Sequence, residues 1–273
     1  MTENRPPLDL TAVRRDLLGP DRALRSVRVV DSTGSTNTDL LTQHEAGVDI
    51  DGMVLIAEHQ SAGRGRNGRS WSSPPRSQIA LSVGLRVAGL PPAGWGWLPL
   101  LTGVAVVDAV TAITGLETGL KWPNDILVGD HKLGGILAEV AAPDPVIVVG
   151  LGLNVSLRAD EAPDARATSL LMLGSTMLDR SALLGSILAE WTARIDRWRG
   201  AGGADAGLMA DYRRRSLTLG TRVRAELPGG REIVGFATDI DELGQLQIRT
   251  AAEAGSPMVA VAAGDITHLR PAD

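Results

Sequence analysis

Apolar positions follow two kinds of spacing along the chain. Short apolar runs bounded by glycine, proline and polar turn residues predict buried strands, whereas apolar residues three and four positions apart predict helices. Both kinds alternate as far as about residue 216, which indicates a mixed α/β domain. Its predicted strands are 26–31, 53–58, 78–87, 118–122, 126–128, 132–140 and 146–154, and the predicted helices are one short helix within residues 8–18, then 38–45, 98–114, 181–199 and 208–216.

The pattern changes at residue 217, after which only short strands are predicted. Strands at this spacing, separated by glycine-rich turns, are typical of a small β-barrel. The chain therefore divides into an N-terminal extension (1–25), an α/β domain (26–216) and a C-terminal barrel (217–273). We also expect strands 132–140 and 146–154 to be neighbours joined by a turn at 143–145. The predicted barrel strands are 221–227, 232–239, 245–250, 258–262 and 265–268.

Composition and charge exclude several classes of protein. The 273 residues are 44% hydrophobic and 22% charged, which excludes wholesale disorder. The lack of cysteine excludes disulfides and thiol chemistry, and the four histidines show no zinc-ligand spacing. A net charge of −5 does not suit a general polyanion-binding surface. The N-terminus does not resemble a signal peptide, and runs such as Ile79–Leu85 and Val146–Val149 are too short to span a bilayer, so we expect a cytoplasmic protein with no membrane or nucleic-acid partner.

The choice of basic residues points to a local site. Only two of the 27 basic residues are lysines, Lys121 and Lys132, and they lie close together in the sequence. Lysine supplies a compact point charge that the planar fork of arginine does not reproduce. The pair therefore favours a site that requires an ammonium group over a chance retention of two lysines.

An arginine- and glycine-rich segment follows the predicted strand 53–58. Glycine lets a ligand approach the backbone closely, and arginine supplies fixed donors to phosphate or carboxylate oxygens. The segment lacks the Gly-Lys-Ser/Thr of a phosphate-binding loop. We favour a site for a small anion over a solvated loop or an RNA-binding segment. Its residues run from Gln60 to Trp71 and include Gly63, Arg64, Gly65, Arg66, Gly68 and Arg69.

Two further polar segments carry candidate site residues. Pro123 restricts the backbone after Lys121, so the lysine is expected to point from a strand end into a defined place. Asn124 and Asp125 beside it suit a ribose, an adenine or hydrated Mg²⁺, although a plain Pro-Asn-Asp turn has the same sequence. The segment Ser32–Asn37 contains good helix N-caps and equally suits a polar ligand group.

In order, these segments resemble the motifs of the biotin–protein ligases. The matching motifs are Gly34–Asn37, Glu58–Gln60, Ala62–Trp71, Lys121–Asp125, Lys132–Leu137 and Gly150–Asn154. The resemblance implies a mixed sheet flanked by helices, like those of class II synthetases and lipoate ligases, followed by an SH3-like barrel. We expect a ligase of the short type, because only 25 residues precede the first predicted strand and a winged-helix repressor domain does not fit into them.

The resemblance also implies a two-step reaction. Biotin carboxylate attacks the α-phosphate of ATP, which gives biotinyl-5′-AMP and pyrophosphate; a lysine of the biotin carboxyl carrier domain of acyl-CoA carboxylases then attacks the mixed anhydride. Because an anion attacks an anion, catalysis depends mainly on positioning and charge neutralisation. The implied small molecules are ATP, biotin and Mg²⁺, the last held by the ATP phosphates with Asp125 as a candidate ligand. The enzyme would be a monomer or a weak homodimer.

The motifs assign a role to individual residues. The implied catalytic residues are Lys121, Arg64 and Arg66. Biotin would contact Ser35, Thr36, Gln60, Gly63, Arg64, Gly65, Lys121 and Gly134, and the nucleotide would contact Arg66, Arg69, Trp71, Asn124, Lys132 and Asn154. Two alternatives stay open: a lipoate–protein ligase, and a non-enzymatic nucleotide- or RNA-binding protein.

Overall fold

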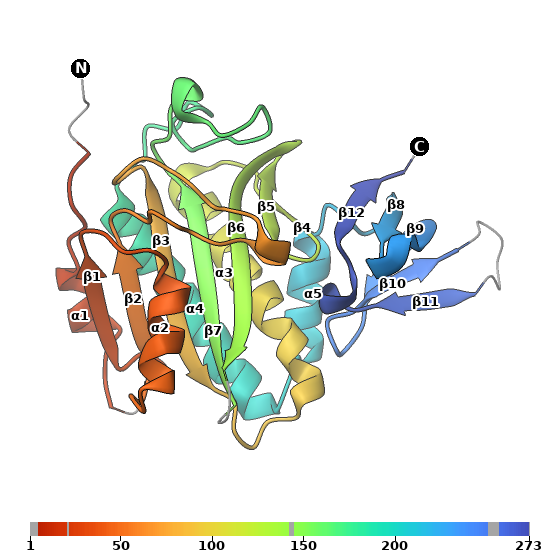
Figure 1. Ribbon diagram of the computed structural model, residues 1–273, viewed down its shortest axis with the longest axis horizontal. Coiled ribbons are helices and arrows are strands. Elements are labelled where there is room, and N and C mark those ends of the chain that lie inside the picture. The colour runs from red at the N-terminus through yellow and green to blue at the C-terminus, as the bar shows by residue number, and fades with distance from the viewer. Residues whose placement is uncertain (1–4, 21, 142–144, 251–256, 273) are drawn as a thin grey trace.

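A seven-stranded mixed sheet forms the centre of the larger part of the molecule (Figure 1). The computed structural model describes residues 5–20, 22–141, 145–250 and 257–272. The strand order is β1-β2-β3-β7-β6-β5-β4; β1 and β2 are parallel, and every other neighbouring pair is antiparallel. The strands are β1 (Ser26–Val30), β2 (Met53–Ala57), β3 (Gln78–Arg86), β4 (Gly119–Lys121), β5 (Asp125–Val128), β6 (His131–Ala141) and β7 (Val146–Asn154).

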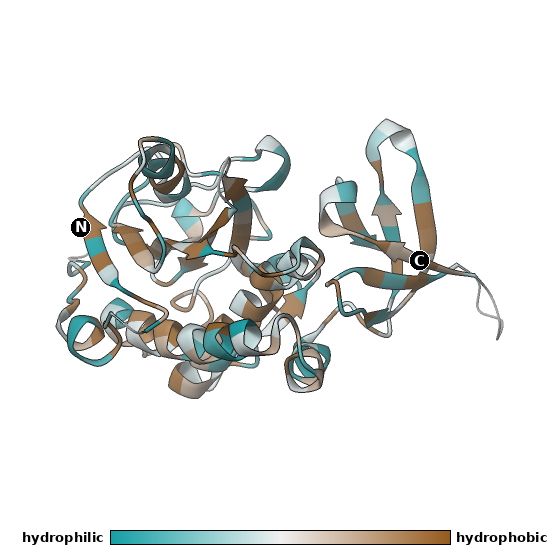
Figure 2. Cartoon of the chain, turned by 90° about the horizontal axis from the view of Figure 1, so that it is seen from below, coloured by the Kyte–Doolittle hydropathy of each residue, from teal (hydrophilic) through white to brown (hydrophobic). Residues whose placement is uncertain are grey.

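Helices cover both faces of this sheet, which explains the continuous apolar runs of its central strands. All nine residues of β7 are buried, and alternate residues belong to different cores. Ile147 and Val149 pack with the helices α3 (Trp97–Thr114) and α4 (Arg180–Ala201), whereas Val148 packs on the side of α2 (Thr36–Glu45). Figure 2 shows helices along one side of the strands, with hydrophobic residues along both. The predicted mixed sheet flanked by helices is confirmed.

The C-terminal sheet has five antiparallel strands in the order β11-β10-β9-β8-β12. Their bounds are β8 (Arg222–Glu226), β9 (Glu232–Ile240), β10 (Leu246–Arg249), β11 (Met258–Val261) and β12 (His268–Pro271). The last strand was predicted three residues too early, because Ala263–Asp265 form a 3-10 turn and the ladder with β8 begins only at His268. Among the described residues no ladder joins β11 to β12, so an SH3-like closure stays a prediction.

Several other predicted boundaries shift. Helix α2 begins at Thr36, two residues earlier than expected, because the extended Ser35 stands at its N-cap. Helix α5 is Ala206–Arg215, since the Asp205 side chain caps it. The short N-terminal helix is α1 (Thr11–Asp16). Strands β6 and β7 are neighbours as predicted, and residues 143 and 144 of their predicted turn lie outside the described residues.

One apolar segment is longer than the runs considered in the sequence. The continuous helical segment Pro92–Thr114, which contains α3, is long and apolar enough to cross a bilayer by length and composition. In the structure, 67% of its most apolar window is buried inside the protein. Its apolar residues pack against α4 and the sheet, as expected of a core helix.

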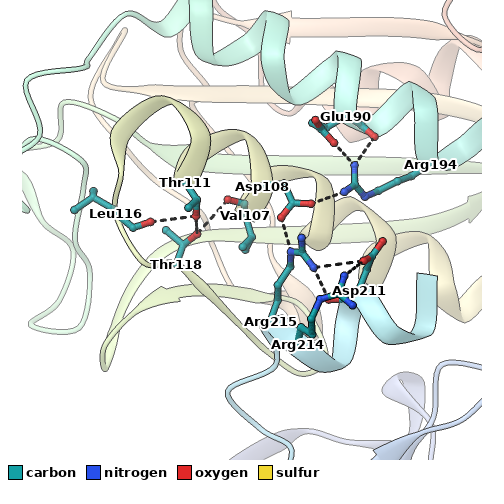
Figure 3. A network of polar contacts seen from close by, with 10 residues as sticks. All are labelled: Val107, Asp108, Thr111, Leu116, Thr118, Glu190, Arg194, Asp211, Arg214 and Arg215. Carbon is teal, nitrogen blue, oxygen red and sulfur yellow. Dashed lines mark hydrogen bonds and ion pairs between the residues drawn. The ribbon is translucent and has the colours of Figure 1, made fainter. Parts of the chain in front are cut away.

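The helices α3, α4 and α5 are joined by a charged network (Figure 3). Asp108 of α3 accepts from Arg194 of α4 and from Arg215 of α5, and Asp211 pairs with Arg214 and Arg215. Helix α5 leads directly into the C-terminal sheet, so this network fixes the point at which that sheet leaves the larger part of the molecule.

A turn of the C-terminal sheet also docks against two tryptophans. The indole of Trp122 donates to Gly244 O at 3.2 Å, and that of Trp97 donates to Asp241 O at 3.1 Å. Both indoles are buried. The segment that follows Lys121 is therefore held by both sheets, which brings β12 close to the lysine.

Candidate functional site

A cavity of about 580 Å³ lies where the two sheets meet. Its walls come from the N-terminus of α2, the loop that follows β2, the turn between β4 and β5, the middle of β6 and β7, and the start of β12. Most of the predicted site residues line it. They are Ser35, Thr36, Gln60, Arg64, Gly65, Arg66, Arg69, Trp71, Lys121, Asn124, Asp125, Lys132 and Asn154.

Two predicted biotin contacts, Gly63 and Gly134, are not among the residues that line the cavity. A Cβ at Gly63 would lie 2.3 Å from the carbonyl oxygen of Trp71, and one at Gly134 would lie 2.8 Å from Gly152 O. Both glycines therefore allow backbone segments to pack closely. The first brings the two ends of the loop together, and the second brings β6 against β7.

One end of the cavity is a buried network of neutral polar groups. The side-chain oxygen of Gln60 accepts from Thr36 N at 2.9 Å and from Thr36 Oγ1 at 3.1 Å. The hydroxyl of Ser82 lies 2.7 Å from Thr36 Oγ1 and 2.6 Å from Asn37 Oδ1. Asn37 fits there because β7 has Gly150 beneath it, where a Cβ would lie 2.2 Å from the amide oxygen. This end suits a ligand group that both donates and accepts hydrogen bonds.

Glu139 of β6 anchors the first arginine of the loop. Its Oε1 lies 2.9 Å from Arg64 Nη2, and its Oε2 accepts from Asn37 Nδ2 at 2.8 Å. The sequence prediction missed both Glu139 and Ser82. Their only signal is a polar residue within an otherwise apolar strand, which does not distinguish a site from a solvated edge.

The two lysines lie on the wall formed by β4, β5 and β6. Lys132 Nζ is 2.5 Å from Asp125 Oδ1 and lies over the ring of Trp71, 5.6 Å from its centroid. Lys121 is the last residue of β4 and pairs across the ladder with Asp125. Burial lowers the pKa of Lys121, and the Asp125 carboxylate partly offsets this. Both lysines thus present ammonium groups to one cavity, as their position in the sequence predicted.

The rest of the loop is attached to the C-terminal sheet. Arg66 Nη2 donates to the carbonyls of Ala263 and Ile266, and Asn67 Nδ2 donates to Thr267 O at 3.0 Å. Burial lowers the pKa of the Arg66 guanidinium. The sequence prediction missed the cavity residues of this segment, which have no motif. They are Thr267, His268, Leu269 and Arg270.

Three other predicted nucleotide contacts are also engaged by the protein. Trp71 Nε1 donates to Gln78 Oε1 at 2.6 Å, and its ring packs on Gly152, where a Cβ would lie 2.4 Å from the indole nitrogen. Asn154 Nδ2 donates to Thr168 O, and Asn124 Nδ2 donates to Ile136 O, both at 2.9 Å. The last two amides therefore brace the wall of the cavity.

The described residues contain no group of three or more histidine, cysteine, aspartate or glutamate side chains that could hold a metal ion. The carboxylates that line the cavity are Asp125 and Asp164, and Asp125 is already paired with Lys132. This arrangement does not favour Asp125 as a dedicated ligand. It fits Mg²⁺ that enters on the phosphates of a nucleotide, since Mg²⁺ needs few protein ligands there.

The fold and the cavity together define a class of protein. A neutral hydrogen-bonding end, next to arginines and lysines that face one space, can hold a polar small molecule and neutralise an anionic centre formed beside it. The described residues provide no thiol nucleophile and no protein metal cage. This is the arrangement expected of an enzyme that activates a small carboxylic acid with a nucleotide.

Comparisons with known proteins identify the family. The chain belongs to the biotin protein ligases. The model of the biotin/lipoate A/B protein ligase family matches residues 29–155, and that of the biotin protein ligase C-terminal domain matches residues 218–269. The chain is 52% identical over 97% of its length to the biotin–[acetyl-CoA-carboxylase] ligase of Mycobacterium tuberculosis, 97% of which is covered.

Longer relatives and a solved structure agree. The bifunctional ligase/repressor BirA of Bacillus subtilis is 32% identical over 81% of this chain and 68% of its own length. The biotin protein ligase of Aquifex aeolicus in complex with biotin and ATP has a TM-score of 0.77 and 26% identity, covering 91% of this chain and 100% of that one.

Proposed function

We propose that this chain is an ATP-dependent biotin–[acetyl-CoA-carboxylase] ligase. It joins biotin to AMP and then transfers biotin to a lysine of the biotin carboxyl carrier domain of an acyl-CoA carboxylase. The observation that carries the proposal is the arrangement of one cavity, in which the Thr36–Gln60 network adjoins a cluster of loop arginines and Lys121. The two ends match the two ends of biotin, one neutral and the other a carboxylate.

Biotin binds in the proposal with its ring at the neutral end. The ureido group has one acceptor and two donors, and Ser35, Thr36 and Gln60 offer complementary groups. The carboxylate then points toward Arg64 and Lys121. This orientation leaves the cavity wall around Trp71 and Lys132 for the nucleotide, whose anionic phosphates face the cations.

The first step needs charge neutralisation more than acid–base chemistry. The biotin carboxylate must approach the α-phosphate, and Coulomb repulsion between the two anions opposes it. Lys121 and Arg66 are partly withdrawn from water, so their charges act at lower effective dielectric than they would at the surface. Mg²⁺ bound to ATP contributes further positive charge to the phosphates. No protein side chain is required as a nucleophile.

In the second step the carrier lysine attacks the acyl carbon of the adenylate. The new amide bond forms as the C–O bond to the phosphate breaks, AMP leaves with that electron pair, and the amine loses its proton. The adenylate must survive until the carrier docks, so the loop and β12 serve as its cover. We place this enzyme in the cytoplasm as a monomer or weak homodimer, with no DNA-binding role for residues 1–25.

The test is exchange of labelled pyrophosphate into ATP, followed by transfer to a carrier. We expect exchange only with biotin, and label on one lysine of the carrier but none on a carrier in which arginine replaces that lysine. Lipoate in place of biotin should give background exchange. Exchange with lipoate but not with biotin would assign the chain to lipoate activation, and no exchange with either would exclude both ligase activities.

The lowered pKa of Lys121 predicts a pH dependence. The ammonium form neutralises the phosphate, so activity is retained below the pKa of Lys121 and lost as the pH rises through it. Because burial holds this pKa below the ordinary lysine value of 10.5, the alkaline decline in kcat/KM should begin at a correspondingly lower pH. A pyrophosphate-exchange profile measures this, with circular dichroism at each pH to separate it from unfolding. A profile that is flat up to the ordinary lysine range would contradict it.

The loop that follows β2 should be protected by substrates. Its positive charges repel one another until an anion binds, and the attachments of Asn67 to Thr267 and of Arg69 to His268 lie at the surface. Limited trypsin digestion should cut at Arg64, Arg66 or Arg69, and biotin with MgATP should slow this cutting. Cleavage at the exposed Arg231 serves as an internal control. If ligands leave the loop cuts unchanged, the loop does not close over them.

A further inference from the structure

The buried guanidinium of Arg180 lies just outside the cavity. Arg180 is the first residue of α4, and its side chain is 5% exposed. Its Nη1 lies 2.7 Å from Glu58 Oε2 and 3.1 Å from Gln78 O, and its Nη2 donates to Pro6 O at 2.6 Å. The Glu58 side chain is 4% exposed. A charge pair this deeply buried is stable only when its hydrogen bonds are satisfied, as they are here.

The same pair holds a segment at the start of the chain, residues 5–10, which we name the N-terminal strap. Glu58 Oε1 accepts from Leu8 N at 2.7 Å, so the carboxylate is shared between the strap and Arg180. Arg5 donates to Ser156 O at 2.7 Å, beyond the end of β7. Leu8 and Leu10 are buried in the main core. The strap therefore crosses the site ends of β2, β3 and β7.

Gln78 links this attachment to the cavity. Its backbone carbonyl accepts from Arg180, while its side-chain oxygen accepts from Trp71 Nε1 at 2.6 Å. Gln78 is 1% exposed, so its side-chain amide has little room to change its orientation. Arg180 and Gln78 do not line the cavity, whereas Trp71 does. The arginine can therefore affect the ligand only through its neighbours.

We propose that Arg180 is a positioning residue, which with Glu58 and the N-terminal strap fixes Gln78 and thereby holds the Trp71 indole in the nucleotide wall of the cavity. This inference rests on the proposed function for the identity of the ligand beside Trp71. The geometry requires arginine rather than lysine at position 180. The three acceptors, on Glu58, Gln78 and Pro6, match the planar guanidinium and not a single ammonium group.

The first test is Arg180→Lys, which keeps the charge beside Glu58 but not the fork. We expect the KM for ATP to rise about tenfold, while kcat and the KM for biotin change less than about twofold, because only the nucleotide wall loosens. An equal loss in all three parameters would overturn the proposal, as would unchanged kinetics together with unchanged exchange of the Trp71 indole proton.

Arg199→Lys is the matched control, since the same helix carries a similar attachment at its other end. Arg199 Nη2 lies 2.9 Å from Asp51 Oδ1 and 3.3 Å from Arg86 O, at the ends of β2 and β3 far from the site. This variant should lower the urea midpoint without changing the KM for ATP. If it raises that KM as much as Arg180→Lys does, the effect is general destabilisation and the proposal fails.

A second variant tests the link itself and is useful even if Arg180→Lys folds poorly. Gln78→Met removes the acceptor for Trp71 with little change in volume, so it alone should raise the KM for ATP. Arg180→Lys added to it should then raise that KM no further, since the connection is already broken. Full additivity of the two effects would contradict transmission through Gln78.

Hydrogen exchange of the Trp71 indole proton provides a readout that needs no substrate. The indole signals can be assigned with Trp71→Phe, and exchange of this proton should be about tenfold faster in Arg180→Lys. Unchanged exchange would overturn the inference. Faster exchange with an unaltered KM for ATP would support the positioning of Trp71 but contradict the proposed placement of the nucleotide.

Discussion

Lys121→Ala is expected to lower the rate of biotinyl-adenylate formation by at least about 10²–10³ while leaving the protein folded. Removing one preorganised charge that faces developing negative charge costs about 3–4 kcal/mol in sites of this kind. The lysine stands at the end of β4, its backbone is held by the ladder to β5, and its neighbour Trp122 is anchored to the C-terminal sheet. The side chain contributes little to the core, so the fold should not depend on it. Pyrophosphate exchange measures the effect.

Lys121→Arg is also expected to form biotinyl-adenylate much more slowly than the wild type. The guanidinium is larger and directional, and the cavity is already lined by two further cations, Lys132 and Arg166. Lys132→Ala is the comparison, because it removes the same charge from a lysine that is already paired with Asp125. We expect it to raise the KM for ATP more than it lowers kcat. Near wild-type exchange by either Lys121 variant would show that Lys121 is not catalytic.

Local patterns were sufficient to predict most of the larger domain. The central strand β7 is buried on both faces, so it appears in the sequence as an unbroken apolar run, and the prediction 146–154 coincides with its bounds. Helix boundaries were less accurate because caps determine them. Helices α2 and α5 begin directly after Ser35 and Asp205, which are single polar residues with many similar ones nearby in the sequence.

The site was predictable only where one segment carries several of its groups. The arginine loop and the lysine pair have a local composition that few structural roles require. Glu139 was not predictable, because one carboxylate in a strand has the same sequence whether it anchors Arg64 or faces solvent. The cavity residues of β12 were missed for a related reason. They are more than 140 residues from Lys121 in sequence, and only the docking of the two sheets brings them to it.

The contacts of the N-terminal strap could not be predicted from the sequence either. Residues 1–25 were predicted as an N-terminal extension, since their few apolar residues suggest one small helix. In the structure Leu8 belongs to the main core, and its backbone amide is bound by the buried Glu58. A contact between one backbone amide and one distant carboxylate has no sequence pattern, although it fixes the strand that leads to Gln60.

Arg66→Gly is expected to release biotinyl-AMP about 10- to 100-fold faster, which corresponds to the loss of a charge-assisted contact of roughly 1.5–3 kcal/mol. Synthesis should suffer less, because Arg64, Arg69 and Lys121 still neutralise the phosphate. Arg66 also donates to the carbonyls of Ala263 and Ile266, so the variant loses an attachment between the loop and the C-terminal sheet. Both losses favour escape of the adenylate before a carrier docks.

Escaped biotinyl-AMP acylates any accessible amine, so the variant should label bystander lysines on serum albumin in proportion to enzyme concentration, whereas the wild type labels only its carrier. Asn67→Ala separates the two contributions of Arg66. It removes one hydrogen bond between the loop and Thr267 without removing a charge. If Arg66 retains the adenylate by its charge, Asn67→Ala remains carrier-specific; if the attachment of the loop is decisive, Asn67→Ala also labels albumin. An Arg66→Gly enzyme that is merely slow and still carrier-specific would show that retention of the adenylate depends on other residues.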